Sequence, residues 1–120
     1  MLVIDDDPDV RGFIVTSLAE AGYCVSEAAD GQAGLARFAE QRPHLVVLDY
    51  AMPGMSGAEV AERLLEERPG QPILFVSGYR ETEAIRRTAP DAPLLTKPFR
   101  ADTLDSAVRG ALGVRSVVVA

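Results

Sequence analysis

The segment Leu45-Val46-Val47-Leu48, which leads directly into Asp49, determines the fold class that the sequence predicts. Each residue of the segment is apolar, whereas a strand with one face in water alternates apolar and polar residues. A strand buried on both faces belongs to a parallel sheet that helices cover on both sides. The sequence therefore predicts an α/β protein, with Asp49 at the carboxyl end of a central strand.

Short apolar runs and amphipathic segments alternate on both sides of this strand. Further strands are expected at residues 2–4, 23–28, 73–76 and 93–96. Helices are expected to begin near residues 8, 30, 57 and 81, with a last helix through residues 104–112. Because crossovers between parallel strands are right-handed, few topologies remain. The expected fold is a flavodoxin-like (βα)5 three-layer sandwich, with a five-stranded parallel sheet in the order 2-1-3-4-5.

Local signals mark several helix starts. Asp7-Pro8 combines a capping side chain with a proline suited to the first helical position. Ser56 and Glu59 have the spacing of a capping box. The second helix is expected to face the core with Leu35, Phe38 and Ala39.

Length and charge limit the classes of protein. The chain has 120 residues, which suit one domain, expected here over residues 1–113 with residues 114–120 as a tail or linker. It carries a net charge of -6 and shows no basic stripe. Direct binding of nucleic acid by this domain is therefore not expected.

The sequence also bears on the cellular compartment. No apolar stretch is long enough to cross a bilayer, and the start has no basic region typical of a signal peptide. The abrupt start suggests a piece of a longer protein. The single cysteine, Cys24, lies in an apolar, strand-like run and is expected to be a buried thiol. A reducing cytoplasm suits such a thiol best.

Polar residues follow four of the expected strands: Asp5-Asp6-Asp7, Asp49, Ser77-Gly78 and Lys97-Pro98. The carboxyl ends of parallel strands lie at the same edge of a sheet, where ligands bind in this class of fold. Taken singly, each feature also fits a solvated loop or a turn, and Asp7 is expected to serve only as a helix cap. Together, they predict that carboxylates, a hydroxyl and an amine converge at one edge.

These groups point to phosphoryl transfer. Crowded carboxylates repel each other unless a cation neutralises them, and oxygen ligands suit Mg²⁺ where a phosphate takes part. An ammonium and a hydroxyl can hold phosphoryl oxygens while a carboxylate acts as the nucleophile. Lys97 is the only lysine in the chain, and the other eleven basic residues are arginine. A compact point charge therefore has a specific use at this position.

Four motifs at these strand ends resemble the receiver domains of two-component response regulators and of hybrid histidine kinases. They are Val3-Ile4-Asp5-Asp6-Asp7-Pro8, Leu48-Asp49-Tyr50-Ala51-Met52-Pro53-Gly54-Met55-Ser56-Gly57, Val76-Ser77-Gly78 and Thr96-Lys97-Pro98-Phe99. The resemblance extends from Leu2 to about Leu112. It implies a switch that catalyses its own phosphorylation and dephosphorylation and receives its phosphoryl group from a sensor histidine kinase or a histidine phosphotransfer domain.

The resemblance also implies a role for individual residues. Asp49 would be the phosphoacceptor. Asp6 and Asp49 would ligate Mg²⁺ directly, together with the backbone carbonyl of Ala51, and Asp5 would bind through a metal-held water. Ser77 and Lys97 would each contact a phosphoryl oxygen.

Three further positions bear on how such a receiver works. The Lys97-Pro98 peptide is similar to the cis bond of the family. Leu94 stands where many receivers carry Tyr or Phe, so the usual aromatic switch is not expected. Ala51 stands where many carry a polar side chain, which puts the usual hydrolysis rate in doubt.

Two other functions remain open at this point. A haloacid-dehalogenase-like phosphatase would use Asp5 as its nucleophile, although Pro8 and Asp9 do not match that pattern. A pseudo-receiver would bind partners without accepting phosphate, but such domains typically lose an acid or the lysine. There is no Walker A motif, so ATP is not expected to be the direct phosphoryl donor.

Overall fold

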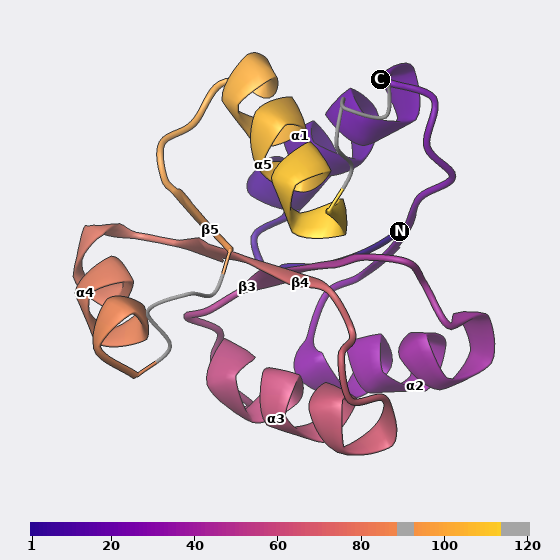
Figure 1. Ribbon diagram of the computed structural model, residues 1–120, viewed down its shortest axis with the longest axis vertical. Coiled ribbons are helices and arrows are strands. Elements are labelled where there is room, and N and C mark those ends of the chain that lie inside the picture. The colour runs from indigo at the N-terminus through magenta and orange to yellow at the C-terminus, as the bar shows by residue number, and fades with distance from the viewer. Residues whose placement is uncertain (89–92, 114–120) are drawn as a thin grey trace.

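The computed structural model describes residues 1–88 and 93–113 and has three layers, with a parallel sheet between two layers of helices (Figure 1). The strands are β1 (Leu2–Ile4), β2 (Ser26–Ala28), β3 (Val46–Asp49), β4 (Ile73–Ser77) and β5 (Leu94–Thr96). All neighbouring strands pair in parallel, in the order β2-β1-β3-β4-β5. The predicted fold class and strand order are therefore confirmed.

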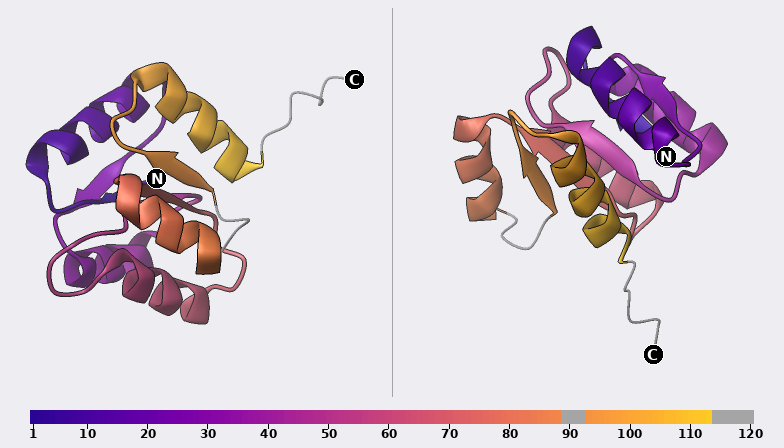
Figure 2. Two further views of the ribbon diagram at one scale, coloured as in Figure 1. Left: turned by 90° about the vertical axis from the view of Figure 1, so that its left-hand side faces the viewer. Right: turned by 90° about the horizontal axis from the view of Figure 1, so that it is seen from above.

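Helices follow the strands as the sequence predicts. They are α1 (Pro8–Glu20), α2 (Gly31–Gln41), α3 (Gly57–Glu67), α4 (Tyr79–Thr88) and α5 (Ala101–Leu112). Two further views show α1 and α5 together on one face of the sheet, and α2 and α3 together on the other (Figure 2). Helix α4 packs against β4 and β5 at the end of the sheet.

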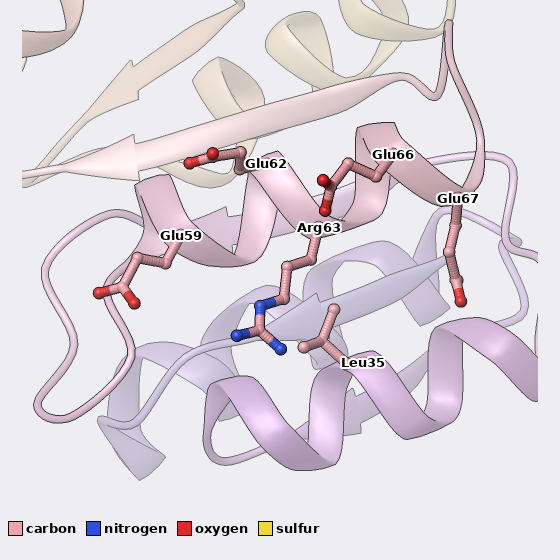
Figure 3. Close-up of a pocket in the computed structure, with 6 residues that line it drawn as sticks. All are labelled: Leu35, Glu59, Glu62, Arg63, Glu66 and Glu67. Atoms are coloured by element: carbon pink, nitrogen blue, oxygen red, sulfur yellow. The ribbon is translucent and has the colours of Figure 1, made fainter.

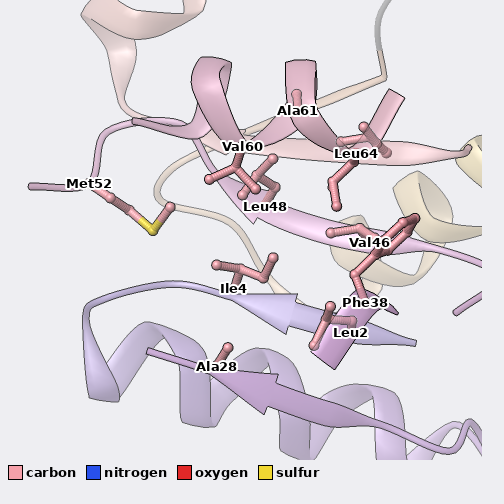
Figure 4. Close-up of a cluster of buried hydrophobic side chains, with 11 residues drawn as sticks. Leu2, Ile4, Ala28, Phe38, Val46, Leu48, Met52, Val60, Ala61 and Leu64 are labelled. Carbon is pink, nitrogen blue, oxygen red and sulfur yellow. The ribbon is translucent and has the colours of Figure 1, made fainter. Parts of the chain in front are cut away.

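The hydrophobic core lies on both faces of the sheet. Val46 and Leu48 join the buried cluster beneath α2 and α3 (Figure 4). Val47, the residue between them, belongs to the second cluster, beneath α1 and α5. Successive residues of a strand point to opposite faces, so a strand covered on both sides has to be apolar throughout. This explains the uninterrupted run that precedes Asp49.

The predicted helix caps are present. The Asp7 carboxylate accepts hydrogen bonds from the backbone N–H groups of Asp9 and Val10, and Pro8 occupies the first position of α1. Ser56 and Glu59 form a reciprocal capping box at the start of α3. Each cap satisfies backbone donors that a helix start would otherwise leave unpaired.

Two expectations about burial were wrong. Cys24 is exposed rather than buried, because β2 begins only at Ser26 and leaves Cys24 in the preceding loop. Ala39 is also exposed, whereas Gly31 and Gly34 are buried on α2. A Cβ on Gly34 would meet the Ile4 side chain at 2.5 Å, so α2 approaches the sheet through glycine. The helical spacing of apolar residues had instead predicted that Ala39 would face the sheet, because that pattern gives no weight to glycine.

None of the described helices is long and apolar enough to span a membrane. The predicted tail or linker, residues 114–120, lies outside the described residues.

Candidate functional site

Three acidic residues meet at the carboxyl edge of the sheet. Asp5 and Asp6 follow β1, and Asp49 ends the neighbouring strand β3. One carboxylate oxygen of each lies within 4.8 Å of the others. Asp6 is exposed, whereas Asp5 and Asp49 are only 1% and 2% exposed. The structure thus brings together the acids that the sequence placed at this edge.

The oxygen atoms of Asp5 indicate what the cluster can bind. Its Oδ1 accepts a hydrogen bond of 2.9 Å from the backbone N–H of Asp7. Its Oδ2 is buried without a hydrogen-bond partner among the described residues. A buried carboxylate oxygen without a partner is costly, and a hard cation held by oxygen ligands would remove that cost. The donor set therefore fits Mg²⁺ rather than a metal that prefers sulfur or imidazole.

The electrostatics of the metal-free chain also favour a cation. The pKa of Asp49 is raised to about 7, because burial and, next, the Asp5 carboxylate raise it by more than the Lys97 ammonium lowers it. Burial likewise raises the pKa of Asp5, although the hydrogen bond from the Asp7 N–H and the charge of Lys97 lower it. The folded chain thus resists having both carboxylates ionised together, and a cation would relieve that repulsion.

Lys97 approaches Asp49 from β5. Its Nζ lies 3.4 Å from Asp49 Oδ1, and its side chain is 31% exposed. Its backbone N–H donates to the Ser77 carbonyl at 2.8 Å, which ties the lysine to the end of β4. The Lys97-Pro98 peptide is cis, as the sequence suggested. One positive charge therefore faces the buried acid.

Ser77 ends β4 as predicted, but its hydroxyl points toward α4 rather than toward Asp49 and Lys97. The Ser77 side chain is fully buried, and its Oγ is hydrogen-bonded to Thr82 Oγ1 of α4 at 2.8 Å. Within the described part of the chain, no hydrogen bond joins the Ser77 side chain to Asp49 or Lys97. Thr82 escaped the sequence analysis because nothing distinguishes it from other polar residues of a charged helix.

Gly57 and Arg11 also shape the site, although the sequence analysis assigned neither of them a role there. The Gly57 N–H donates to the Tyr50 carbonyl at 2.8 Å, and a Cβ here would collide with the Asp49 carbonyl oxygen. Arg11 donates through Nη1 to the Asp5 carbonyl at 2.8 Å and pairs with Glu27 at 2.9 Å. Both hold the backbone beside the acids. The Ser-Gly pair of the third helix start was a usable signal for Gly57, whereas the contacts of Arg11 depend on tertiary structure.

The loop after β3 and the start of β5 carry the two residues that depart from the resemblance. Ala51 is exposed, two residues beyond Asp49. Leu94 is half-buried at the start of β5 and pairs with Phe75 of β4. The side chain at the position where many receivers carry Tyr or Phe is therefore aliphatic, as the sequence indicated.

A hollow of about 690 Å³ between α2 and α3 is not part of this cluster (Figure 3). Its lining consists of Leu35, Glu59, Glu62, Arg63, Glu66 and Glu67. The charged members are exposed, and none of the acids at the sheet edge lines the hollow. Exposed glutamates on a helix are ordinary solvated side chains. The functional site is therefore placed at the strand ends rather than in this hollow.

Comparison with known proteins agrees with the site. Over 110 residues the chain is 36% identical to the nitrogen assimilation regulatory protein NtrX of Azorhizobium caulinodans, covering 87% of this chain and 24% of that protein. It is 35% identical to the response regulator receiver protein CpdR of Brucella abortus, covering 82% and 84% of the two chains. The crystal structure of the NtrX receiver domain from Brucella abortus superposes with a TM-score of 0.86 at 29% identity, covering 95% and 98%.

The chain spans only about a quarter of NtrX but most of CpdR. The sequence model for the response regulator receiver domain matches residues 1–109, which include every acid of the cluster as well as Ser77 and Lys97. With the strand order and the convergent acids, this shows that the chain belongs to the family of response regulator receiver domains.

Proposed function

We propose that Asp49 accepts a phosphoryl group from a phosphohistidine and that the domain then changes conformation. The observation that carries this proposal is the buried Asp49 carboxylate beside Asp5 and Asp6, with Lys97 Nζ 3.4 Å away. An Asp49 oxygen attacks phosphorus, a P–O bond forms, and the P–N bond breaks, with its electron pair going to the imidazole nitrogen. The product is an acyl phosphate on Asp49 and a free histidine on the donor.

The acids and the neighbouring loop would hold Mg²⁺. Asp6 and Asp49 would bind it directly with the Ala51 backbone carbonyl, and Asp5 would bind through a water. The unpartnered Asp5 Oδ2 and the all-oxygen donor set support this assignment. Bound Mg²⁺ supplies positive charge for the oxygens of the transferred group.

Lys97 and Ser77 would hold the phosphoryl group from the other side. The Lys97 ammonium is already close to Asp49, so it would pair with a phosphoryl oxygen with little rearrangement. Ser77 would have to turn its hydroxyl away from Thr82 to reach another oxygen. With these groups the domain would catalyse its own phosphorylation. Attack of water on phosphorus would then break the P–O bond to Asp49, which releases inorganic phosphate and returns Asp49 to a carboxylate.

The donor would be a sensor histidine kinase or a histidine phosphotransfer domain. We assign residues 1–113 to the receiver and residues 114–120 to a tail or linker, which would join it to an output domain or to a hybrid kinase. The net charge of -6 supports a role without direct nucleic-acid contact for this domain. We also propose a cytoplasmic location, since a reducing compartment suits the exposed free thiol of Cys24.

The test is to map the phosphorylated residue. The chain is incubated with acetyl phosphate and Mg²⁺, the acyl phosphate is trapped with borohydride, and peptides are identified by mass spectrometry. We expect the modification on Asp49, no modification of Asp49→Asn, and normal labelling of the exposed control Asp102→Asn. Modification of Asp5 would instead support a phosphatase of the haloacid-dehalogenase type. If neither acetyl phosphate nor a phosphohistidine donor labels the chain, the chain is a pseudo-receiver.

A further inference from the structure

Three hydroxyl groups form a partly buried network between β4, α4 and β5. Thr82 Oγ1 lies 2.8 Å from Ser77 Oγ, 3.2 Å from Thr96 Oγ1 and 2.9 Å from the Gly78 carbonyl oxygen. Ser77 is fully buried, and the two threonines are half-buried. The network connects the strand end beside Asp49 to the first turns of α4.

Counting protons fixes the direction of each hydrogen bond. A carbonyl oxygen can only accept, so the bond to Gly78 uses the single hydroxyl proton of Thr82. Ser77 and Thr96 must then both donate to Thr82 Oγ1, which has two lone pairs for them. All three protons are used, and the Ser77 proton is held by Thr82.

This direction sets up a competition for the Ser77 proton. A phosphoryl oxygen on Asp49 would accept that proton, but Thr82 Oγ1 already accepts it in the unphosphorylated chain. Ser77 is fully buried, so its hydroxyl cannot be left without an acceptor except at a cost in free energy. Ser77 can therefore donate to the phosphoryl oxygen only if it breaks its hydrogen bond to Thr82.

We propose that Thr82 is a positioning residue that holds the Ser77 hydroxyl away from Asp49 and thereby favours the unphosphorylated conformation. This inference rests on the proposed function of Asp49. It assigns to Thr82 of α4 the hydrogen bond that opposes the change in conformation. The chain has Leu94 at the position where many receivers carry an aromatic residue.

The same network links the state of Ser77 to α4. Gly78 O accepts both the N–H and the hydroxyl of Thr82, and the Gly78 N–H donates to Glu81 Oε1 at 3.1 Å. When Ser77 turns toward the phosphoryl group, Thr82 loses one of its two donors. The first turns of α4 are therefore the segment that senses the change.

The test measures the affinity for beryllofluoride, which mimics a phosphoryl group on aspartate in the presence of Mg²⁺. Binding to the complete chain is followed by the amide resonance of Gly78. Thr82→Val keeps the shape of the side chain but removes the competing acceptor. We expect it to bind beryllofluoride about threefold to tenfold more tightly than the wild type, since one neutral hydrogen bond is lost from the unbound state alone.

Three variants serve as controls. Thr82→Ser keeps the hydroxyl and should restore the wild-type affinity. Thr96→Val removes a different bond to the same oxygen and should change the affinity much less than Thr82→Val does. Thr103→Val makes the same chemical change at an exposed position of α5 and should have no effect.

Urea unfolding with and without beryllofluoride separates this role from a merely structural one. Thr82→Val should lower the stability of the free chain by more than that of the bound chain, because only the bond from Ser77 differs between the two states while the bonds to Gly78 and Thr96 are lost in both. An equal deficit in both states, or an unchanged affinity, would overturn the inference while leaving the proposed function intact. If Thr82→Val does not fold, Thr82→Ala takes its place. A wild type that binds no beryllofluoride at Asp49 would refute the proposed function, and the inference with it.

Discussion

At the scale of single residues, the site combines a buried acid with one compact positive charge. The 3.4 Å between Lys97 Nζ and Asp49 Oδ1 is long for a charge-assisted hydrogen bond. The lysine stem is flexible and its ammonium small, so Lys97 could move to an oxygen of the proposed phosphoryl group. A guanidinium is larger, planar and less adaptable at such a contact.

Lys97→Arg should therefore impair phosphorylation despite its unchanged charge. We expect labelling by acetyl phosphate to fall by about tenfold or more, because an oriented charge at the reacting oxygens is lost. The melting temperature should stay close to that of the wild type. The matched control is Arg100→Lys, the reverse change at an exposed site, which should label normally. Equal labelling of Lys97→Arg and wild type would contradict this account of the single lysine.

The raised pKa of Asp49 predicts how stability depends on pH in the absence of metal. The folded-state pKa is about 7 against an ordinary value of 3.8, so between these values the folded chain binds more protons than the unfolded chain. The free energy of unfolding should fall as the pH rises through this window, with a contribution from Asp49 on the order of a few kcal/mol.

Asp49→Asn tests this dependence because asparagine does not ionise. In the presence of EDTA, it should be more stable than the wild type at pH 7.5 and nearly equal to it at pH 4. Urea unfolding at several pH values measures the difference. Asp102→Asn, at an exposed position, should follow the wild-type curve. Parallel curves for Asp49→Asn and wild type would show that burial does not disfavour the Asp49 charge.

At the scale of elements, the close approach of α3 to the end of β3 shapes the site. Gly57 opens α3, and a Cβ there would lie 2.5 Å from the Cα of Tyr50 as well as against the Asp49 carbonyl. Both obstacles are backbone atoms, which cannot swing aside as a flexible side chain can. The helix and the strand bearing Asp49 therefore fit together only with glycine at this position.

Gly57→Ala should destabilise the fold by about 1 to 3 kcal/mol, the usual cost of overpacking. Gly12→Ala provides the matched control, since Gly12 is a helical glycine of α1 with nothing within 4 Å of an added Cβ. Alanine there should raise stability by about 0.5 to 1 kcal/mol. Urea unfolding in EDTA would measure both changes. A stable Gly57→Ala protein would contradict the close contact between α3 and β3.

At the scale of the whole molecule, the acid cluster would link metal binding to folding. The three carboxylates come from the ends of two strands, so only the folded chain brings them within 4.8 Å of one another. A cation that binds the folded state alone stabilises it by mass action. The proposed Mg²⁺ site should therefore be visible as a change in stability.

Mg²⁺ at about ten times its dissociation constant should add about 1.4 kcal/mol to the free energy of unfolding, which raises the melting temperature of a domain of this size by about 6 °C. Thermal melts with Mg²⁺ or EDTA measure the shift. Asp6→Ala should lose most of the shift, whereas Asp102→Ala should keep it. If Mg²⁺ raised the melting temperature of Asp6→Ala as much as that of the wild type, Asp6 would not be a metal ligand.

The fold, and which acids gather at the site, follow from patterns along the chain. A run that is apolar on every residue specifies a strand buried on both faces, and the parallel order then carries Asp5, Asp6 and Asp49 to one edge. The caps at Asp7 and Ser56 were equally predictable, because they depend on contacts within a few residues.

The orientation of the polar groups and the atoms they contact depend on tertiary packing. The hydroxyl of Ser77 turns to Thr82, Cys24 lies outside its strand, and Gly57 makes room for the backbone at Asp49. Each of these depends on where another element lies in space, whereas periodicity and local capping report only on neighbours along the chain. The proposed competition between Thr82 and a phosphoryl group for the Ser77 proton likewise depends on the packing of α4 against β4.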